Sequence, residues 1–294
     1  LRWTCKSTRA VARELSAAGH PASDWLVRQL LYDLGYSLQA NQKTTEGRQH
    51  PDRDAQFRYL NARVSRQLRA GQPAVSVDTK KKELVGDFKN AGRAWHPRRH
   101  PERVQVHDFL DPTKGKAIPY GVYDLTQNRG WVSVGVDHDT ATFAVNTLRR
   151  WWTAMGARAY PRAKSLLVIA DSGGSNGTRL RLWKWELQRL ATATGLIVHV
   201  SHLPPGTSKW NKIEHRLFSF ISQNWRGRPL TTHAAIVQLI AKTRTAGGLQ
   251  VRCVLDRRRY PTATAISDAQ MATIRLRPQA FHGDWNYSIH PPQR

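Results

Sequence analysis

Residues 165–201 read SLLVIADSGGSNGTRLRLWKWELQRLATATGLIVHVS, and this order predicts a strand, a glycine-rich turn, a helix and a second strand. The runs SLLVIAD (165–171) and LIVHVS (196–201) are short and apolar, which is typical of buried strands. Residues 180–194 between them have the length and spacing of a helix that stops at Gly195. Two strands joined through a helix lie parallel in one sheet, so this stretch predicts an α/β fold.

Upstream of this unit, the sequence predicts three strands and one helix. The strand-like runs are 73–78 (PAVSVD), 118–125 (IPYGVYDL) and 130–137 (GWVSVGVD), and the residues TQNR between the last two predict a hairpin turn. A helix is expected over 140–155, and the proline-containing residues 96–117 are expected to form a loop or insertion. Three early strands followed by alternating helices and strands predict a ribonuclease H-like fold, a mixed sheet with helices on its faces.

Two short helices are expected near the start of the chain, over residues 7–18 and 23–34. Each begins at a serine that can cap a helix and stops at a glycine. Such a pair has the shape of a helix-turn-helix, and the basic residues that follow favour contact with DNA over an ordinary helical hairpin. We therefore expect a small helix-turn-helix-like DNA-binding region at 1–70, the ribonuclease H-like domain at 71–230, and a helical, basic extension at 231–294.

The chain is strongly basic, with 46 Lys and Arg residues against 21 Asp and Glu residues and a formal net charge of +25. A polyphosphate such as double-stranded DNA is the natural partner of this charge, because binding releases counterions. No apolar run approaches the roughly 20 residues that a membrane-spanning helix needs, and no secretory signal is evident. The two cysteines provide neither a zinc framework nor a disulfide scaffold. A cytoplasmic protein is expected.

Three acidic residues follow or lie close to predicted strand ends. Asp78 ends the first strand, Asp171 ends the fourth, and Glu214 lies in a helix expected over about 208–222. The first and fourth strands are neighbours in this topology, so their carboxylates come together, and hard oxygen ligands suit Mg²⁺ or Mn²⁺. Asp124 and Asp137 are alternatives for the first acid. Asp78 is favoured because choosing Asp124 leaves too few strands before the next helix.

Two other kinds of site fit the sequence less well. Residues 172–177 are glycine-rich but lack the Gly-Lys-Ser/Thr ending of a nucleotide-triphosphate loop. His199, His202 and His215 lie close in sequence, but their spacing does not match a helical zinc site. We expect these histidines to lie behind the site or at the surface.

Five further segments of the chain have a distinctive sequence. They are VDTKKKELVGDFKNAGR (77–93), IPYGVYDLTQNRGWVSVGVDHDTATFAV (118–145), ADSGGSNG (170–177), LPPGTSKWNKIEHRLFSFISQNWRGRPL (203–230) and DWNYSI (284–289). These segments resemble the ISAzo family of bacterial insertion-sequence DDE transposases, and the resemblance covers nearly the whole chain. The stretch from Leu203 to Glu214 is also similar to the block of mariner-like transposases that carries the third catalytic acid.

The resemblance implies an enzyme that cuts and joins DNA ends. It makes Glu214 the third catalytic acid and Asp171 the second, with Asp78 first by its place on strand one. These acids would hold two Mg²⁺ or Mn²⁺ ions that direct water at a phosphodiester, after which the freed 3′-hydroxyl attacks target DNA. We expect nearby lysines to contact phosphates and the N-terminal helices to grip the element's terminal repeat. The lysines are Lys80, Lys81, Lys82, Lys209 and Lys212.

The resemblance also bears on how the protein is organised. Family members are longer at the N-terminus, so we expect this chain to be part of a longer protein. By analogy with transposases of this chemistry, a homodimer on DNA and association with the bacterial nucleoid are expected. Two other functions stay open: a DNA-binding remnant that has lost catalysis, and a ribonuclease H-like nuclease that cleaves without joining.

Overall fold

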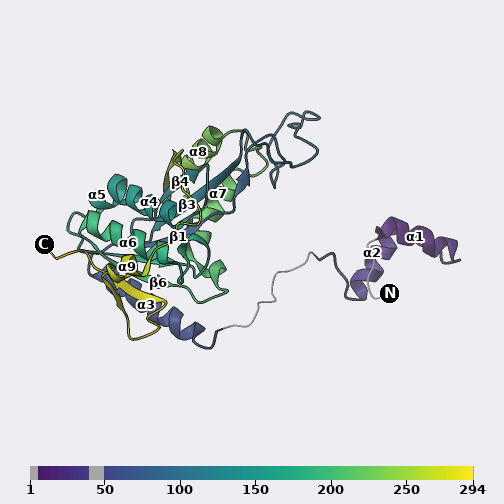
Figure 1. The fold of residues 1–294 in the computed structure, drawn as a ribbon. Coiled ribbons are helices and arrows are strands. Elements are labelled where there is room, and N and C mark those ends of the chain that lie inside the picture. Colours follow the sequence, from purple (N-terminus) through teal and green to yellow (C-terminus); the bar gives the residue numbers. More distant parts are fainter. Residues whose placement is uncertain (1–5, 40–49, 294) are drawn as a thin grey trace. The chain divides into compact units, whose positions relative to one another are not determined.

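The computed structural model describes residues 6–39 and 50–293 (Figure 1). The chain divides into two compact units, Leu1–Gly47 and Arg48–Arg294. Part of the predicted DNA-binding region, namely residues 1–5 and 40–49, lies outside the described residues. The two units are therefore a pair of N-terminal helices and a larger α/β body.

The first unit contains the two predicted helices, α1 (Thr8–Ala17) and α2 (Asp24–Asp33). The side chains of Ser7 and Ser23 cap them, each accepting a hydrogen bond from the backbone N–H three residues later, at 3.2 and 3.0 Å. Capping satisfies one of the otherwise unpaired N–H groups at a helix start. The sequence prediction of two serine-capped helices is confirmed, and their role on DNA stays a prediction.

The second unit is built on one mixed sheet, which has nine strands within the described part of the chain. Eight of them lie in the order β7-β4-β3-β1-β5-β6-β9-β8, and β2 pairs with β3. The strands are β1 (Ala74–Thr79), β2 (Glu83–Leu84), β3 (Lys116–Asp124), β4 (Arg129–Gly135), β5 (Ser165–Ala170), β6 (Ile197–His202), β7 (Gln250–Asp256), β8 (Leu276–Pro278) and β9 (Asn286–Ile289).

The centre of the sheet has the ribonuclease H-like arrangement that the sequence predicts. Strand β3 is antiparallel to both of its neighbours in this part of the sheet, β4 and β1, whereas β1, β5 and β6 run parallel to one another. Parallel pairing follows from the helical connections between β4 and β5 and between β5 and β6, because a helix returns the chain to the same end of the sheet. The carboxyl ends of β1 and β5 therefore lie side by side.

Helices cover both faces of the sheet (Figure 1). Leu166 and Val168 of β5 face a core shared with α4 and α6, and the alternate residues Leu167 and Ile169 face a core shared with α3. A third core lies between β3, β4, β7 and the helices η4, α7 and α8. The helices are α3 (Arg53–Arg69), α4 (Ala141–Trp151), η1 (Trp152–Gly156), α5 (Ala157–Ala159), η2 (Gly174–Asn176), α6 (Arg181–Thr194), η3 (Ser208–Trp210), η4 (Glu214–Phe218), α7 (Ser219–Asn224), α8 (His233–Ala241) and α9 (Asp268–Ala272).

Helix α3 belongs to the second unit, although its residues fall within the predicted DNA-binding region 1–70. Leu60 and Val64 are buried in a cluster with Ala74, Leu167 and Ile169 of the sheet. An amphipathic helix is stable where it can bury its apolar face, and the sheet provides that surface. The contact ties the start of the second unit to the two strands that carry the predicted acids.

The segment after residue 230, predicted as a helical extension, contains the helices α8 and α9 and also three strands that the sequence did not predict. It contributes β7, which pairs with β4, and β9, which pairs with β6 and carries β8 at its outer side. Without these strands, β4 and β6 would be sheet edges with unpaired backbone N–H and C=O groups. β8 and β9 are too short for a clear alternating pattern in the sequence, so the prediction missed them.

The predicted loop or insertion at 96–117 is confirmed up to the start of β3. Residues 85–115 contain no helix or strand and extend away from the sheet between β2 and β3 (Figure 1). Trp95, Val106 and Phe109 of this arm are exposed. Among the described residues, no helix has both the length and the apolar character required to cross a membrane.

We predict that replacing Leu60 by alanine lowers the free energy of unfolding of the second unit by about 2–5 kcal/mol, because a buried leucine leaves a cavity. The exposed neighbour Asn61 is the matched control, and Asn61→Ala should change stability by less than about 0.5 kcal/mol. Urea denaturation followed by tryptophan fluorescence measures both. Equal effects of the two substitutions would show that α3 does not pack on the sheet.

Candidate functional site

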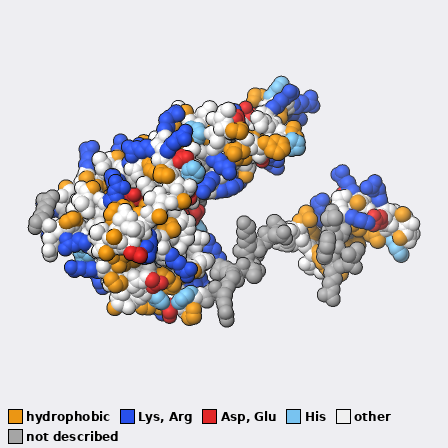
Figure 2. All heavy atoms as spheres, in the orientation of Figure 1, with side chains coloured by type: hydrophobic (Ala, Val, Ile, Leu, Met, Phe, Trp, Pro, Cys, Tyr) orange, Lys and Arg blue, Asp and Glu red, His pale blue; other side chains and the backbone are white. Residues whose placement is uncertain are grey.

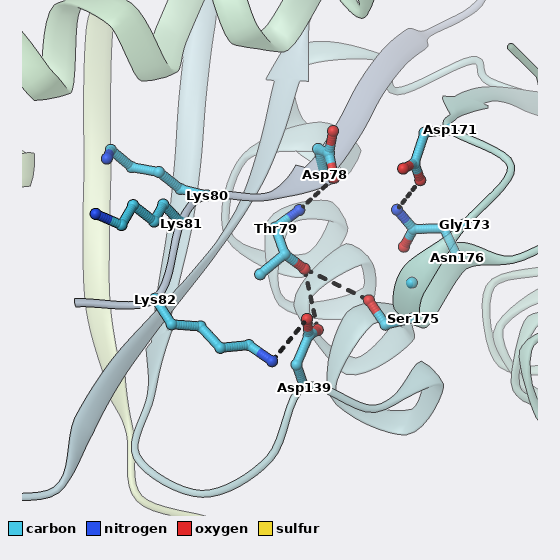
Figure 3. Close-up of a pocket in the computed structure, with 11 residues that line it drawn as sticks. Asp78, Thr79, Lys80, Lys81, Lys82, Asp139, Asp171, Gly173, Ser175 and Asn176 are labelled. Atoms are coloured by element: carbon cyan, nitrogen blue, oxygen red, sulfur yellow. Dashed lines mark hydrogen bonds and ion pairs between the residues drawn. The ribbon is translucent and has the colours of Figure 1, made fainter. Parts of the chain in front are cut away.

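Two of the predicted acids, Asp78 and Asp171, line one cavity of about 390 Å³ (Figure 3). Asp78 lies near the end of β1, and Asp171 directly follows β5, the parallel neighbour of β1. The topology thus brings together two residues that are 93 positions apart in the sequence (171 − 78 = 93). The sequence expectation that these carboxylates meet agrees with this geometry.

Hydrogen bonds hold both carboxylates in place. The backbone N–H of Thr79 donates to Asp78 Oδ1 at 2.7 Å. Asn176 donates through Nδ2 to Asp171 Oδ1 at 3.3 Å, and its own Oδ1 accepts from the hydroxyl of Tyr120 at 2.6 Å. Tyr120 is fully buried in β3. The turn after β5, which carries Asp171, is therefore hydrogen-bonded through Asn176 to Tyr120 of the sheet.

The third predicted acid, Glu214, lies in a helix that differs from the one expected over 208–222. Residues Ser208–Trp210 form a separate 3-10 turn, and the helix begins after Asn211, so Glu214 lies in its first turn. That turn, η4, is π-helical, and α7 continues from it. Single π-turns inserted in helices are frequent at functional sites. The sequence predicted one helix from about residue 208, and the break at Asn211 has no distinctive sequence signal.

Asn211 connects the helix of Glu214 to the strand of Asp78. This side chain is fully buried and donates to the carbonyl of Val77 at 3.0 Å and to Asp78 Oδ2 at 3.3 Å. Its Oδ1 accepts a hydrogen bond from Ser76, and its backbone carbonyl accepts the N–H of Glu214 at 3.0 Å. One buried amide thus fixes the first and third acids relative to each other.

Gly121 of β3 allows the same helix to pack closely on the sheet. It is the register partner of Asp78, and a Cβ atom at Gly121 would lie 2.6 Å from the ring of Phe218 and 2.8 Å from Cδ1 of Ile213. Those two side chains flank the turn that carries Glu214. Real Cβ contacts are not this short, so the hydrogen side chain of glycine is required for the observed approach.

Burial raises the pKa values of all three acids, and the charge of at least one neighbouring carboxylate adds to each shift. Burial raises the pKa of Asp78 to about 8, and the charges of Asp171 and Glu214 contribute to the shift. Burial also raises the pKa of Asp171, with a contribution from Asp139. The pKa of Glu214 is raised by burial and less by Asp171, while the nearby Lys80 opposes the shift. Perturbed pKa values in a cavity are typical of functional sites.

A fourth acid, Asp139, lines the same cavity and was not selected from the sequence. Its Oδ1 accepts a hydrogen bond from the hydroxyl of Thr79 at 3.0 Å, and its Oδ2 lies 3.6 Å from the ammonium of Lys82 (Figure 3). It immediately precedes Thr140, the N-cap of α4. In the sequence, Asp139 is the second aspartate of GVDHD (135–139), and only the first, Asp137, was predicted as an alternative for the first acid.

The alternatives for the first acid lie elsewhere. Asp124 is buried at the far end of β3, where it pairs with Val75, and accepts the hydroxyl of Tyr160 at 2.8 Å. Asp137 accepts the backbone N–H of Tyr260 at 2.6 Å. Neither aspartate lines the cavity that contains Asp78. Both have structural partners that account for them.

The five lysines proposed for phosphate contact fall into different settings. Lys80 is 7% exposed, lies 3.3 Å from Glu83 and places its ammonium 4.5 Å from the ring centre of Trp225. Lys81 and Lys82 are exposed and, like Lys80, lie at the cavity. Lys209 and Lys212 are exposed and are not among the residues that line it. The exposed lysines are accessible to solvent, and Lys82 among them pairs with Asp139.

The site has the oxygen donors that a divalent cation prefers, but they are not gathered into a complete coordination shell. Asp78 and Asp171 line one cavity, where burial raises the pKa of both carboxyl groups, and carboxylate oxygens are ligands that Mg²⁺ prefers. Glu214 is close enough to affect the pKa of Asp78. Among the described residues, no three His, Cys, Asp or Glu side chains are arranged to bind a metal ion.

Comparison with known proteins identifies one matching family, described as the Rhodopirellula transposase DDE domain, over residues 1–291. A search of curated proteins found no match. Similar solved structures include the Mos1 transposase paired-end complex with left transposon end, which is 14% identical with a TM-score of 0.47, and a pre-cleavage Mos1 transpososome, which is 12% identical with a TM-score of 0.47. Each match covers 80% of this chain and 65% of the other, so the chain spans about two thirds of those proteins.

We predict that Gly121→Ala lowers the free energy of unfolding by about 1–3 kcal/mol, because the added methyl group overpacks the contact with Ile213 and Phe218. Gly247→Ala is the control, since the nearest atom there is 3.8 Å from the added Cβ. Chemical denaturation of both variants provides the comparison. A loss no greater than that of the control would contradict the close packing of the Glu214 helix.

We also predict that Asp78 contributes a loss of stability to the metal-free protein as the pH rises from about 4 to 8. The folded-state pKa of Asp78 is raised, so the folded protein keeps a proton that the unfolded chain releases, and this contribution to stability is lost as the pH passes through the folded pKa. For one proton the slope is at most about 1.4 kcal/mol per pH unit. Denaturation in EDTA should show a shallower decline for Asp78→Asn, and identical slopes would contradict the shift.

Proposed function

The chain belongs to the Rhodopirellula transposase DDE domain family, and from this premise we propose that it cuts DNA at the ends of a mobile element and joins those ends to target DNA. The observation that carries the proposal is the shared cavity of Asp78 and Asp171 beside the helix of Glu214. Phosphoryl transfer of this kind requires acids that hold metal ions and needs no nucleophilic side chain. Family membership also agrees with the resemblance seen in the sequence.

We assign Asp78, Asp171 and Glu214 as the three acids, and Mg²⁺ or Mn²⁺ as the bound ions, two in number. The ions would supply charge stabilisation for the attacking and leaving oxygens of the phosphodiester. Asp78 and Asp171 would hold them from the sheet, and Glu214 would complete the site from the helix. Asn211 would keep the carboxylate of Asp78 oriented, because it already contacts Oδ2.

The DNA would lie against the basic surface around this cavity. Figure 2 shows Lys and Arg side chains over much of the visible face of the second unit. Lys81 and Lys82 are exposed at the cavity and would contact phosphates there, with Lys209 and Lys212 further along the backbone. Lys80 would contribute its positive charge from the protein interior, since its ammonium is buried between Glu83 and Trp225.

The N-terminal helices would bind the terminal repeats, with α2 entering the major groove. Two copies of the chain would work together, one at each end of the element. A nuclease that cleaves without joining, or a remnant that binds without cleaving, would carry the same acids or the same basic surface. Product analysis separates these three functions.

We predict that Glu214→Gln reduces metal-dependent strand cleavage by more than about 100-fold and leaves DNA affinity within about threefold. The substitution removes a metal-binding charge without changing side-chain size. The substrate is a labelled duplex carrying the sequences that flank the gene, incubated with Mn²⁺ and unlabelled target DNA. Cleaved and joined products are resolved on a denaturing gel.

Glu102→Gln is the matched control, because Glu102 is exposed on the arm and lies away from the cavity. It should cleave and join as the unaltered protein does. Undiminished cleavage by Glu214→Gln would overturn the assignment of the third acid. Cleavage without joined product by the unaltered protein would instead favour the nuclease, and binding without cleavage would favour the remnant.

A further inference from the structure

His202 is fully buried at the end of β6, directly behind Asp171. Its Nδ1 lies 2.8 Å from the backbone carbonyl oxygen of Asp171, and its Nε2 lies 3.2 Å from the hydroxyl of Tyr287 in β9. Both ring nitrogens therefore have a partner. The sequence predicted that His202 lies behind the site or at the surface, and in the structure it is buried behind the site.

The partners determine which nitrogen of His202 carries the proton. A carbonyl oxygen only accepts, so Nδ1–H donates to Asp171, and the unprotonated Nε2 accepts from the hydroxyl of Tyr287. Tyr287 is free to donate in this direction because it accepts the indole N–H of Trp183 at 3.0 Å. Burial lowers the pKa of His202 to about 4, so the ring is neutral near pH 7. The result is a directed chain of three hydrogen bonds from α6 to Asp171.

The backbone of His202 is held as firmly as its ring. Its N–H donates to the carbonyl of Trp285 at 2.9 Å, and its own carbonyl accepts Nε2 of Gln56 at 2.7 Å. Gln56 is buried in α3 and also exchanges hydrogen bonds with Asn286. The imidazole is thus fixed by α3, β6 and β9 together.

The contact at Asp171 is the point where this rigid group meets the site. The turn after β5 is also joined to the chain after β6 by the hydroxyl of Ser172, which donates to the carbonyl of Leu203, and by the N–H of Leu203, which donates to Ala170 at 2.8 Å. The bond from His202 reaches the backbone carbonyl of Asp171 itself. Orientation of that peptide determines where the carboxylate points within the cavity.

We propose that His202 is a positioning residue for Asp171, locked in its Nδ1–H form by Tyr287 and Trp183, and that it sets the affinity of the site for a divalent cation. This inference rests on the proposed function, because it takes Asp171 as a cation-binding acid. It makes β9, at the far end of the chain, part of the support of the site. Supporting hydrogen bonds of this kind typically change metal affinity by about 10–100-fold.

Two substitutions at His202 separate positioning from simple filling of space. An asparagine amide occupies the place of Nδ1, so His202→Asn keeps a donor for the Asp171 carbonyl. A glutamine amide reaches the place of Nε2, so His202→Gln keeps the contact with Tyr287 and loses the one with Asp171. The probe is Mn²⁺ alone, with binding measured by calorimetry and with the thermal unfolding temperature recorded for each variant.

We expect His202→Gln to weaken Mn²⁺ binding by about tenfold or more and His202→Asn to stay within about threefold of the unaltered protein. Equal Mn²⁺ affinities for the two variants, or weaker binding only in proportion to lost thermal stability, would overturn the inference. Tyr287→Phe leaves His202 in place and removes the donor that fixes its tautomer, so it should weaken binding to a smaller extent. Unchanged affinity in Tyr287→Phe would count against the chain of three hydrogen bonds.

Asp171→Asn distinguishes failure of this inference from failure of the proposed function. If Asp171→Asn binds Mn²⁺ as the unaltered protein does, Asp171 is not a cation-binding acid and the proposed site itself is wrong. If Asp171→Asn loses binding while both His202 variants retain it, the proposed site stands and the positioning role of His202 is wrong.

Discussion

Burial of neighbouring carboxylates is the constraint on which the site of this protein depends. The parallel pairing of β1 and β5 brings Asp78 and Asp171 to one cavity, and burial together with their mutual repulsion raises the pKa of Asp78 to about 8. Two such groups are stable only as long as a proton, hydrogen bonds or a cation compensate them. The fold provides the hydrogen bonds through Thr79, Asn176 and Asn211. A divalent cation would provide the rest.

The supports of the three acids come from distant parts of the chain. Asn211 links the strand of Asp78 to the helix of Glu214, and Gly121 on β3 lets that helix pack closely enough to the sheet. His202 and Tyr287 connect the turn of Asp171 to the last strand. Each of these residues is a buried polar group or a closely packed glycine. A buried polar group that loses its hydrogen-bond partner destabilises the folded state. The geometry of the site is thus coupled to the stability of the sheet.

The basic composition and the site have separate physical roles. The net charge of +25 favours association with a polyanion at long range, and it has no direct part in phosphoryl transfer. Lys80 illustrates the difference, because its ammonium is buried against Trp225 and Glu83 and opposes the rise in the pKa of Glu214. Lys81 and Lys82 remain at the surface of the cavity. A lysine that lies close to an acid in the sequence can therefore either stabilise the fold or contact a ligand.

The sequence by itself determined the order of the central strands, the positions of Asp78 and Asp171 at the ends of two of them, and the position of Glu214 in the helix that follows β6, because apolar runs, glycines and caps act over a few residues. Tertiary structure decided what local patterns do not encode. It placed Asp139 in the cavity, moved the start of the Glu214 helix to Asn211, packed α3 on the sheet and added β7, β8 and β9 at the two edges. These features depend on contacts between residues far apart in sequence, and such contacts exist only once the sheet has formed.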